Sequence, residues 1–298
     1  MKSKLQYAAA MTAFGTISIF VRNIPVSSTT LALLRAAIAG TCLLLVRLLS
    51  GHRIHLGSAR ERGLLLLSGA AMGFNWMLLF EAYKYTTVSV ATLSYYFAPV
   101  IVTAVSALIF RERLSRRQLA CFAGATAGLV LVIGLNNLRG GASLRGVGFG
   151  LGAAALYATV ILLNKRIRGV DGVDRTALQF AAAFAVLLPY RLLTEPGAPV
   201  FADMNALGWI CLAVVGLFHT GWMYCLYFSS LRHLEGQQAA ILSYIDPLVA
   251  VLLSCTLLGE PVTALQLAGG ALILGCTLLS ELAPARRQPP SPHPIASE

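Results

Sequence analysis

Long apolar runs separated by short polar gaps fill this sequence as far as about residue 282. Each run holds close to the roughly 20 residues that an α-helix, rising 1.5 Å per residue, needs to cross about 30 Å of hydrocarbon. The pattern therefore predicts an all-α polytopic membrane protein with ten transmembrane helices. The predicted spans are residues 4–21, 30–49, 63–82, 88–110, 117–136, 146–164, 174–193, 207–227, 236–258 and 262–282.

Composition excludes a water-soluble globule. Of the 298 residues, 57% are hydrophobic and only 12% are charged, whereas soluble domains carry about 25% charged residues. A soluble fold of this length could not hide so much apolar surface. The six cysteines all lie inside apolar runs, so we expect neither a disulfide framework nor a metal site, and the sequence indicates no cofactor.

The net charge of +11 concerns membrane orientation rather than nucleic acid, because the basic residues lie in the gaps between apolar runs. If the amino terminus is inside, 17 Lys and Arg residues lie on the inner side, five on the outer side, and Arg35 lies within the second run. This bias predicts that both termini are cytoplasmic. The Pro-rich segment 283–298 is expected to be a disordered cytoplasmic tail.

The two halves of the sequence match each other at a shift of 148 residues, where Pro99 aligns with Pro247, Tyr96 with Tyr244, and Glu112 with Glu260. Ser115 and Thr263 each stand three residues before a Gln, which predicts a capping box at the start of spans 5 and 10. Residues 1–138 and 139–282 are therefore two five-helix repeats. Because five is odd, the second repeat must be inverted, as is common in secondary transporters.

The repeated Pro…Glu-x-[Leu/Val]-[Ser/Thr]-x-x-Gln pattern, with ten spans in two halves, resembles the drug/metabolite transporter (DMT) superfamily and its EamA domains. Within it, the chain is similar to the YddG-type bacterial amino-acid exporters. The resemblance implies a multi-pass protein of the bacterial inner membrane with a small-molecule substrate. It also implies a central cavity lined mainly by spans 1, 3, 4, 6, 8 and 9, with spans 5 and 10 peripheral. Neither span 1 nor span 6 carries the acid that small multidrug members use.

Polar and aromatic side chains deep in the spans are the candidate binding residues, since such groups in a bilayer usually face a cavity or a partner helix. Asp246 is the one acid near the middle of a span, and it could instead serve the kink at Pro247. His219 could be a cavity donor or a titrating group, or it could bond a neighbouring helix. Aromatic walls would favour small, partly apolar zwitterions. The predicted substrate-binding set is Phe14, Asn75, Trp76, Thr92, Tyr95, Tyr96, Tyr157, His219, Trp222, Ser243, Tyr244 and Asp246.

Other residues are expected to act on conformation. Pro99 and Pro247 lie near mid-span, where each removes a backbone hydrogen bond, so we expect hinges at both. Arg35 and Glu81 lie near the same ends of spans 2 and 3 and predict either a structural ion pair or an outer gate. Gly-x-x-x-Gly pairs such as Gly69/Gly73 permit close helix approach, within one chain or in a homodimer.

These observations favour a secondary transporter that exports small metabolites, most simply amino acids, by alternating access. A nucleotide-sugar or drug-type exchanger is the alternative within the superfamily. A channel or lipid scramblase is the alternative from another class. No catalytic sequence motif is present, so an intramembrane hydrolase using His219 and a serine is a weak alternative and no enzyme is expected. The expected partners are the substrate and the lipid bilayer.

Overall fold

Ten helical spans form the protein in the computed structural model, which describes residues 2–51, 54–110, 115–133, 141–197, 201–231, 233–234 and 236–282. The all-α polytopic fold is confirmed. The predicted tail, 283–298, lies outside the described residues. The first repeat contains α1 (Lys2–Val21), α2 (Ser28–Leu49), α3 (Ala59–Tyr85), α4 (Val88–Tyr95), α5 (Ala98–Phe110) and α6 (Arg116–Ile133). The second contains α7 (Gly141–Asn164), α8 (Gly172–Thr194), α9 (Ala206–Ala213), the π-helix η2 (Val214–Trp222), α10 (Met223–Leu231), α11 (Gly236–Ser243), α12 (Ile245–Thr256) and α13 (Ala264–Glu281).

Three of the ten spans depart from a regular α-helix. The fourth is interrupted between α4 and α5, the ninth is interrupted between α11 and α12, and the eighth contains the π-helix η2 between α9 and α10. Within the described residues, seven helical segments of at least 18 residues are apolar enough to cross a membrane. Two shorter apolar helices, Ile241–Thr256 and Ala264–Ser280, follow them. Interrupted helices inside a bilayer are tolerated where neighbouring helices cover the freed backbone groups.

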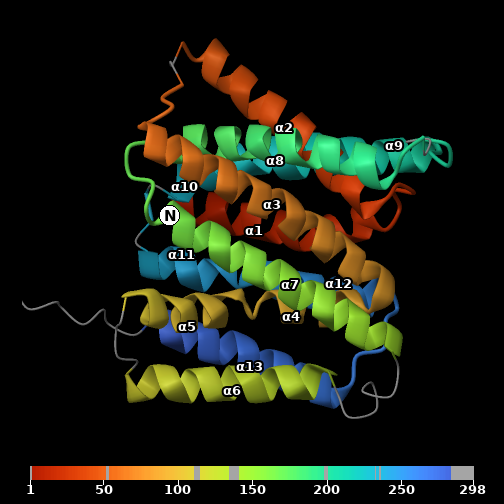
Figure 1. The fold of residues 1–298 in the computed structure, drawn as a ribbon. Coiled ribbons are helices and arrows are strands. Elements are labelled where there is room, and N and C mark those ends of the chain that lie inside the picture. The colour runs from red at the N-terminus through yellow and green to blue at the C-terminus, as the bar shows by residue number, and fades with distance from the viewer. Residues whose placement is uncertain are drawn as a thin grey trace, which may run out of the picture.

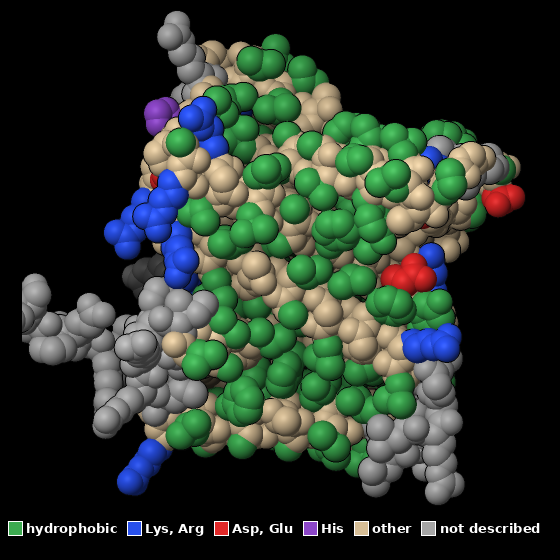
Figure 2. Space-filling model, in the orientation of Figure 1, with side chains coloured by type: hydrophobic (Ala, Val, Ile, Leu, Met, Phe, Trp, Pro, Cys, Tyr) green, Lys and Arg blue, Asp and Glu red, His purple; other side chains and the backbone are tan. Residues whose placement is uncertain are grey.

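The helices run between two faces of the molecule (Figure 1). We call the face where α1 begins the N-terminal face, and the other the opposite face. α1 starts at the N-terminal face, whereas α7 starts at the opposite face, so the two repeats run in opposite senses. Figure 2 shows Lys and Arg gathered along the N-terminal face and a broad hydrophobic surface between the two faces. A surface of that kind suits lipid contact.

Spans 5 and 10, which are α6 and α13, pack against each other at one edge of the bundle, as the family resemblance implied (Figure 1). Their predicted capping boxes are present. The Thr263 hydroxyl accepts from the backbone N–H of Gln266 at 3.2 Å, and the Gln266 side chain accepts from the Thr263 N–H at 2.9 Å. Ser115 and Gln118 repeat the arrangement at the start of α6. α13 thus begins at 264 rather than 262, because Thr263 is its N-cap.

The Gly-x-x-x-Gly pairs pack inside this chain. Gly69 and Gly73 face α8, where an added Cβ would meet Gln179 and Leu187 respectively. Gly128 lies so close to Gly269 of α13 that a Cβ would come within 2.6 Å of the Gly269 carbonyl oxygen. Gly148, by contrast, has nothing within 4 Å of its missing Cβ. Small residues here bring helices of the two repeats together, which is their usual role in membranes.

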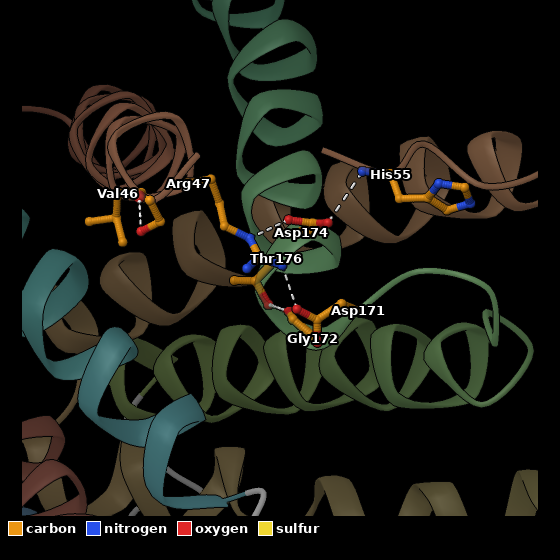
Figure 3. A network of polar contacts seen from close by, with 8 residues as sticks. Val46, Arg47, His55, Asp171, Gly172, Asp174 and Thr176 are labelled. Carbon is orange, nitrogen blue, oxygen red and sulfur yellow. Dashed lines mark hydrogen bonds and ion pairs between the residues drawn. The ribbon is translucent and has the colours of Figure 1, made fainter. Parts of the chain in front are cut away.

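An antiparallel pair, α2 and α8, joins the two repeats at the other edge of the bundle (Figure 1). At the N-terminal face, the Arg47 guanidinium donates from Nε to Asp174 and from an η nitrogen to Asp171, both at 2.5 Å. Asp174 also accepts from the backbone N–H of His55 at 3.2 Å, which fixes the segment before α3 (Figure 3). These contacts hold the end of α2 to the start of α8.

The same arrangement recurs at the opposite face with the two helices exchanged. A shift of 144 residues superposes the N-caps Ser27 and Asp171, and it also aligns Thr30 with Asp174 and Arg47 with Arg191. Arg191 donates from Nε to the Thr30 hydroxyl at 3.1 Å. The pseudo-two-fold symmetry therefore extends to side-chain contacts between α2 and α8, and it gives their register residue by residue.

Two glycines in different surroundings, one at the α6–α13 contact and one on α7, should respond oppositely to substitution by alanine. We expect Gly128→Ala to lower the free energy of unfolding by about 1–3 kcal/mol, because the new methyl group overpacks the contact. Gly148→Ala is the matched control and should be neutral or raise stability by about 0.4–1 kcal/mol, because its site is open and helical. Thermal unfolding of both variants in detergent measures the difference. Equal effects of the two substitutions would contradict the packing account.

Candidate functional site

The two interrupted spans, α4–α5 and α11–α12, meet near the middle of the bundle. The Tyr96 hydroxyl donates to Asp246 Oδ2 at 2.7 Å, which joins the first repeat to the second. α4 ends at Tyr95, and α12 begins just after Tyr244, so the chain is broken at equivalent places in both repeats. The Asp246 carboxylate of the second repeat thus accepts a hydrogen bond from the Tyr96 hydroxyl of the first repeat, and both residues lie beside a break in their span.

Both prolines lie just after these breaks, in the first turn of α5 and of α12. Proline is well tolerated in a first turn, because its missing N–H would have no intrahelical partner there. Each proline therefore lies at a short break in the helical hydrogen bonding of its span, where the sequence predicted a kink. Whether Pro99 and Pro247 act as hinges stays a prediction.

Aromatic rings surround the Tyr96–Asp246 bond. The ring of Tyr95 lies 5.9 Å from that of Tyr96 and 5.5 Å from that of Tyr157. Phe14 of α1 lies 5.2 Å from Tyr224 of α10, and the neighbouring Gly15 packs against the backbone of Asp246. The sequence analysis missed Tyr224, although its alignment with Trp76 at the 148-residue shift was a usable signal. Phe14, Tyr95, Tyr96, Tyr224 and Asp246 are all half-buried; we call them the central group.

Several predicted binding residues are instead buried in helix contacts. Asn75 is 1% exposed and donates to the Ala153 carbonyl of α7 at 2.6 Å. Thr92 and Tyr244 are buried, and Ser243 is half-buried at the end of α11. Trp76 is buried under the side chain of Arg35.

Trp222, a member of the predicted substrate-binding set, faces away from His219, although three-residue spacing in an α-helix would place both on one face. Its side chain is 66% exposed on the surface of the bundle, whereas His219 is fully buried. The reason is the π-helix η2, in which hydrogen bonds run over five residues and residues three apart no longer align. Apolar composition gave no sign of this wider turn.

Both ring nitrogens of His219 have partners in the fold. Nδ1 lies 3.1 Å from the Val214 carbonyl, five residues earlier, and Nε2 lies 2.8 Å from the Thr16 hydroxyl of α1. The ring of Phe20 packs 5.1 Å away. His219 therefore connects η2 to α1, as the structural alternative proposed.

Arg35 and Glu81 do not form the structural pair that their positions suggested. Glu81 accepts from Lys84 at 2.9 Å near the end of α3. Arg35 points into the bundle, where its Nε donates to Thr220 of η2 at 3.1 Å and its guanidinium carbon lies 4.3 Å from the ring centre of Trp76. Position along the spans was similar, but the helical phase of α2 turns Arg35 inward.

Glu260, in the second copy of the repeated corner, links the repeats at the opposite face. One of its oxygens forms an ion pair with Arg22 at the end of α1. The other accepts from the backbone N–H of Val88, the first residue of α4, at 2.8 Å and from the Ser254 hydroxyl. The equivalent residue, Glu112, lies outside the described residues.

Two cavities lie nearer the N-terminal face, and one of about 310 Å³ extends from Lys165 to Pro99.

Comparison with known proteins assigns the family. The model of the EamA-like transporter family matches residues 3–134 and again residues 144–281. The chain belongs to the EamA-like transporter family, within the DMT superfamily. It is therefore a membrane transporter and not an enzyme.

Relatives within the family are similar over most of their length. The chain is 30% identical to the uncharacterized transporter YxxF of Bacillus subtilis over 258 residues, 86% of this chain and 81% of that protein. An uncharacterized transporter of Archaeoglobus fulgidus is also 30% identical, over 89% of this chain and 91% of its own. A probable amino-acid metabolite efflux pump of Salmonella typhimurium is 30% identical over 57% of this chain and 60% of its own.

Solved structures support the same architecture. One crystal structure matches with a TM-score of 0.64 at 18% identity, covering 94% of this chain and 97% of that chain. At this identity the likeness concerns the fold alone. Like the family match, it places nearly the whole described chain in one arrangement.

The contacts of His219 predict a structural rather than a titrating role. We expect His219→Ala and Thr16→Val each to lower thermal stability, because each removes one side of the same hydrogen bond. In a double-mutant cycle the two losses should be coupled by about 1 kcal/mol. Measured transport should keep its pH profile in Thr16→Val. Additive losses, or a shifted pH profile in that variant, would contradict this assignment.

Proposed function

We propose that this transporter exports small metabolites, most simply amino acids, by alternating access around the central group. The observation that carries the proposal is the Tyr96–Asp246 bond, in which the two inverted repeats meet at a carboxylate surrounded by aromatic rings. Substrate sites of inverted-repeat transporters lie between the repeats near the bilayer midplane. Aromatic rings beside a single carboxylate suit a small, partly apolar substrate with an ammonium group.

The comparison with the Salmonella efflux pump supports amino acids as the substrate class, and so does the resemblance to YddG-type exporters. The balance of Lys and Arg supports cytoplasmic termini, so that the N-terminal face is the inner face, and the resemblance to bacterial exporters supports the bacterial inner membrane. Export then runs from the N-terminal face to the opposite face.

Transport into liposomes tests the proposal directly. Purified protein is reconstituted, and uptake of labelled phenylalanine, leucine, threonine and lysine is measured with and without the same unlabelled amino acid inside. We expect saturable uptake that rises in counterflow for the apolar amino acids, because a carrier exchanges substrate as it changes state. Flux that does not saturate would instead indicate a channel, and flipping of lipid would indicate a scramblase. Uptake of nucleotide sugars or cationic drugs, without uptake of amino acids, would indicate an exchanger of the other kind in the superfamily.

The two prolines give a second test of the mechanism. We expect Pro99→Ala and Pro247→Ala to fold and to slow transport, because each would allow the broken span to continue as a stiffer helix. Cysteine labelling from each face should also become unequal, as one state becomes favoured. If both variants transport at the wild-type rate and label equally from both faces, the prolines only shape the helix breaks.

A further inference from the structure

Two opposite charges lie in the interior, and each comes from a different repeat. Arg35 is the eighth residue of α2, about 10 Å from its start along the axis. Only 5% of the surface of Arg35 is exposed to solvent. Asp246 lies in the first turn of α12, within the ninth span. Charges at such depth are costly and mark substrate or ion pathways more often than packing.

The contacts of Arg35 support its charge without neutralising it. Nε donates to the Thr220 hydroxyl, and the guanidinium stacks over Trp76 at 4.3 Å, with Phe80 at 5.8 Å. No ion pair among the described residues involves Arg35. The cation–π contact and the single hydrogen bond hold the plane of the guanidinium in place. In the part of the chain that the structure describes, no carboxylate pairs with its two terminal nitrogens.

Asp246 stands in a matching position. Its one hydrogen bond within the described residues comes from the neutral hydroxyl of Tyr96, so its charge also lacks a protein partner of opposite sign. Among the described residues no ion pair joins Arg35 to Asp246.

Both charged residues lie beside the same part of α1. Arg35 bonds Thr220, whose neighbour His219 bonds Thr16 of α1, while a Cβ on the adjacent Gly15 would lie 2.6 Å from the Asp246 carbonyl oxygen. Aromatic rings connect the two regions, because Phe180 packs against both Trp76 and Tyr224, and Tyr224 packs against Phe14 of α1.

Each of the two charges occurs at only one of two pseudo-symmetric positions. The 144-residue shift that aligns α2 with α8 places Gln179 opposite Arg35, and the 148-residue shift places Ala98 opposite Asp246. Gln179 is satisfied by its helix neighbours, donating to Ser68 at 2.5 Å and to Asn164 at 2.7 Å. Neutral residues thus serve the same structural positions. The charges are additions at one copy of each position.

We infer that Arg35 binds the carboxylate, and Asp246 the ammonium, of one zwitterionic α-amino acid that lies between the two repeats. The inference rests on the proposed function and names the recognition atoms within it. A guanidinium held flat by stacking offers paired N–H groups that match the two oxygens of a carboxylate. An α-amino acid carries its two charges a few ångströms apart, and so it neutralises both residues at once. Its side chain then faces the rings of the central group.

A ligand panel on the wild-type protein tests the inference without any substitution. Unlabelled competitors are added to the uptake of labelled phenylalanine in proteoliposomes. The competitors are phenylalanine, phenylalaninamide, which lacks the carboxylate, and N-acetylphenylalanine, which lacks the ammonium. We expect each derivative to compete about 10- to 100-fold less well than phenylalanine, because each leaves one buried charge unpaired. Competition by the amide equal to that by phenylalanine would overturn the role of Arg35.

Substitutions separate the two ends of the ligand. Arg35→Gln installs the residue that the second repeat carries, and it should weaken phenylalanine about 10- to 100-fold while changing phenylalaninamide little. Asp246→Asn should likewise weaken competition by phenylalanine while changing competition by N-acetylphenylalanine little. Arg35→Lys keeps the charge but loses the planar fork, so we expect an intermediate loss. Arg191→Gln removes another buried arginine, which contacts Thr30, and should leave the preference among the three ligands unchanged.

The outcomes distinguish the inference from the function on which it rests. If the wild-type protein transports no amino acid, the proposed function fails and the inference fails with it. If it transports phenylalanine and Arg35→Gln keeps the wild-type preference for phenylalanine over its amide, only the inference fails. Should Arg35→Gln not fold, as shown by size-exclusion chromatography, the wild-type panel still decides.

Discussion

Hydrocarbon supplies no hydrogen-bond partner, so a polar group among the apolar helices is stabilised only by another group of the chain or by a bound substrate. This constraint explains the contacts that join the two repeats. Arg47 meets two aspartates, Arg191 meets Thr30, and His219 meets Thr16. The hydrophobic effect contributes little between helices in lipid, so such contacts and the close glycine crossings set the arrangement of the bundle.

The inverted repeat distinguishes structural from functional positions. Features that occur in both copies, such as the capping boxes and the breaks ahead of the prolines, serve the fold and its possible motion. Other features occur in one copy alone. Arg35 and Asp246 are of the second kind, and their counterparts are the neutral Gln179 and Ala98. A substrate that pairs with both would bind the two repeats to each other and release them on leaving.

Sequence alone gave the ten spans and the inverted repeat, because hydrophobic length and repeated capping residues are local signals. It also predicted that Tyr96 and Asp246 belong to one region. It failed where geometry depends on neighbours. The π-helix turned Trp222 outward, and the phase of α2 carried Arg35 away from Glu81. The α2–α8 register was missed because it needs a shift of 144 residues instead of the 148 found elsewhere.

The central claim is that one amino acid joins opposite charges from the two repeats. Solid-state NMR of the reconstituted protein with bound ¹³C,¹⁵N-labelled phenylalanine measures the relevant distances in a bilayer. The account predicts that the ligand carboxylate lies within hydrogen-bond distance of the Arg35 guanidinium, about 2.7–2.9 Å between N and O, while the ammonium lies equally close to Asp246. Bound phenylalanine that contacts neither residue, or only one of them, would contradict it.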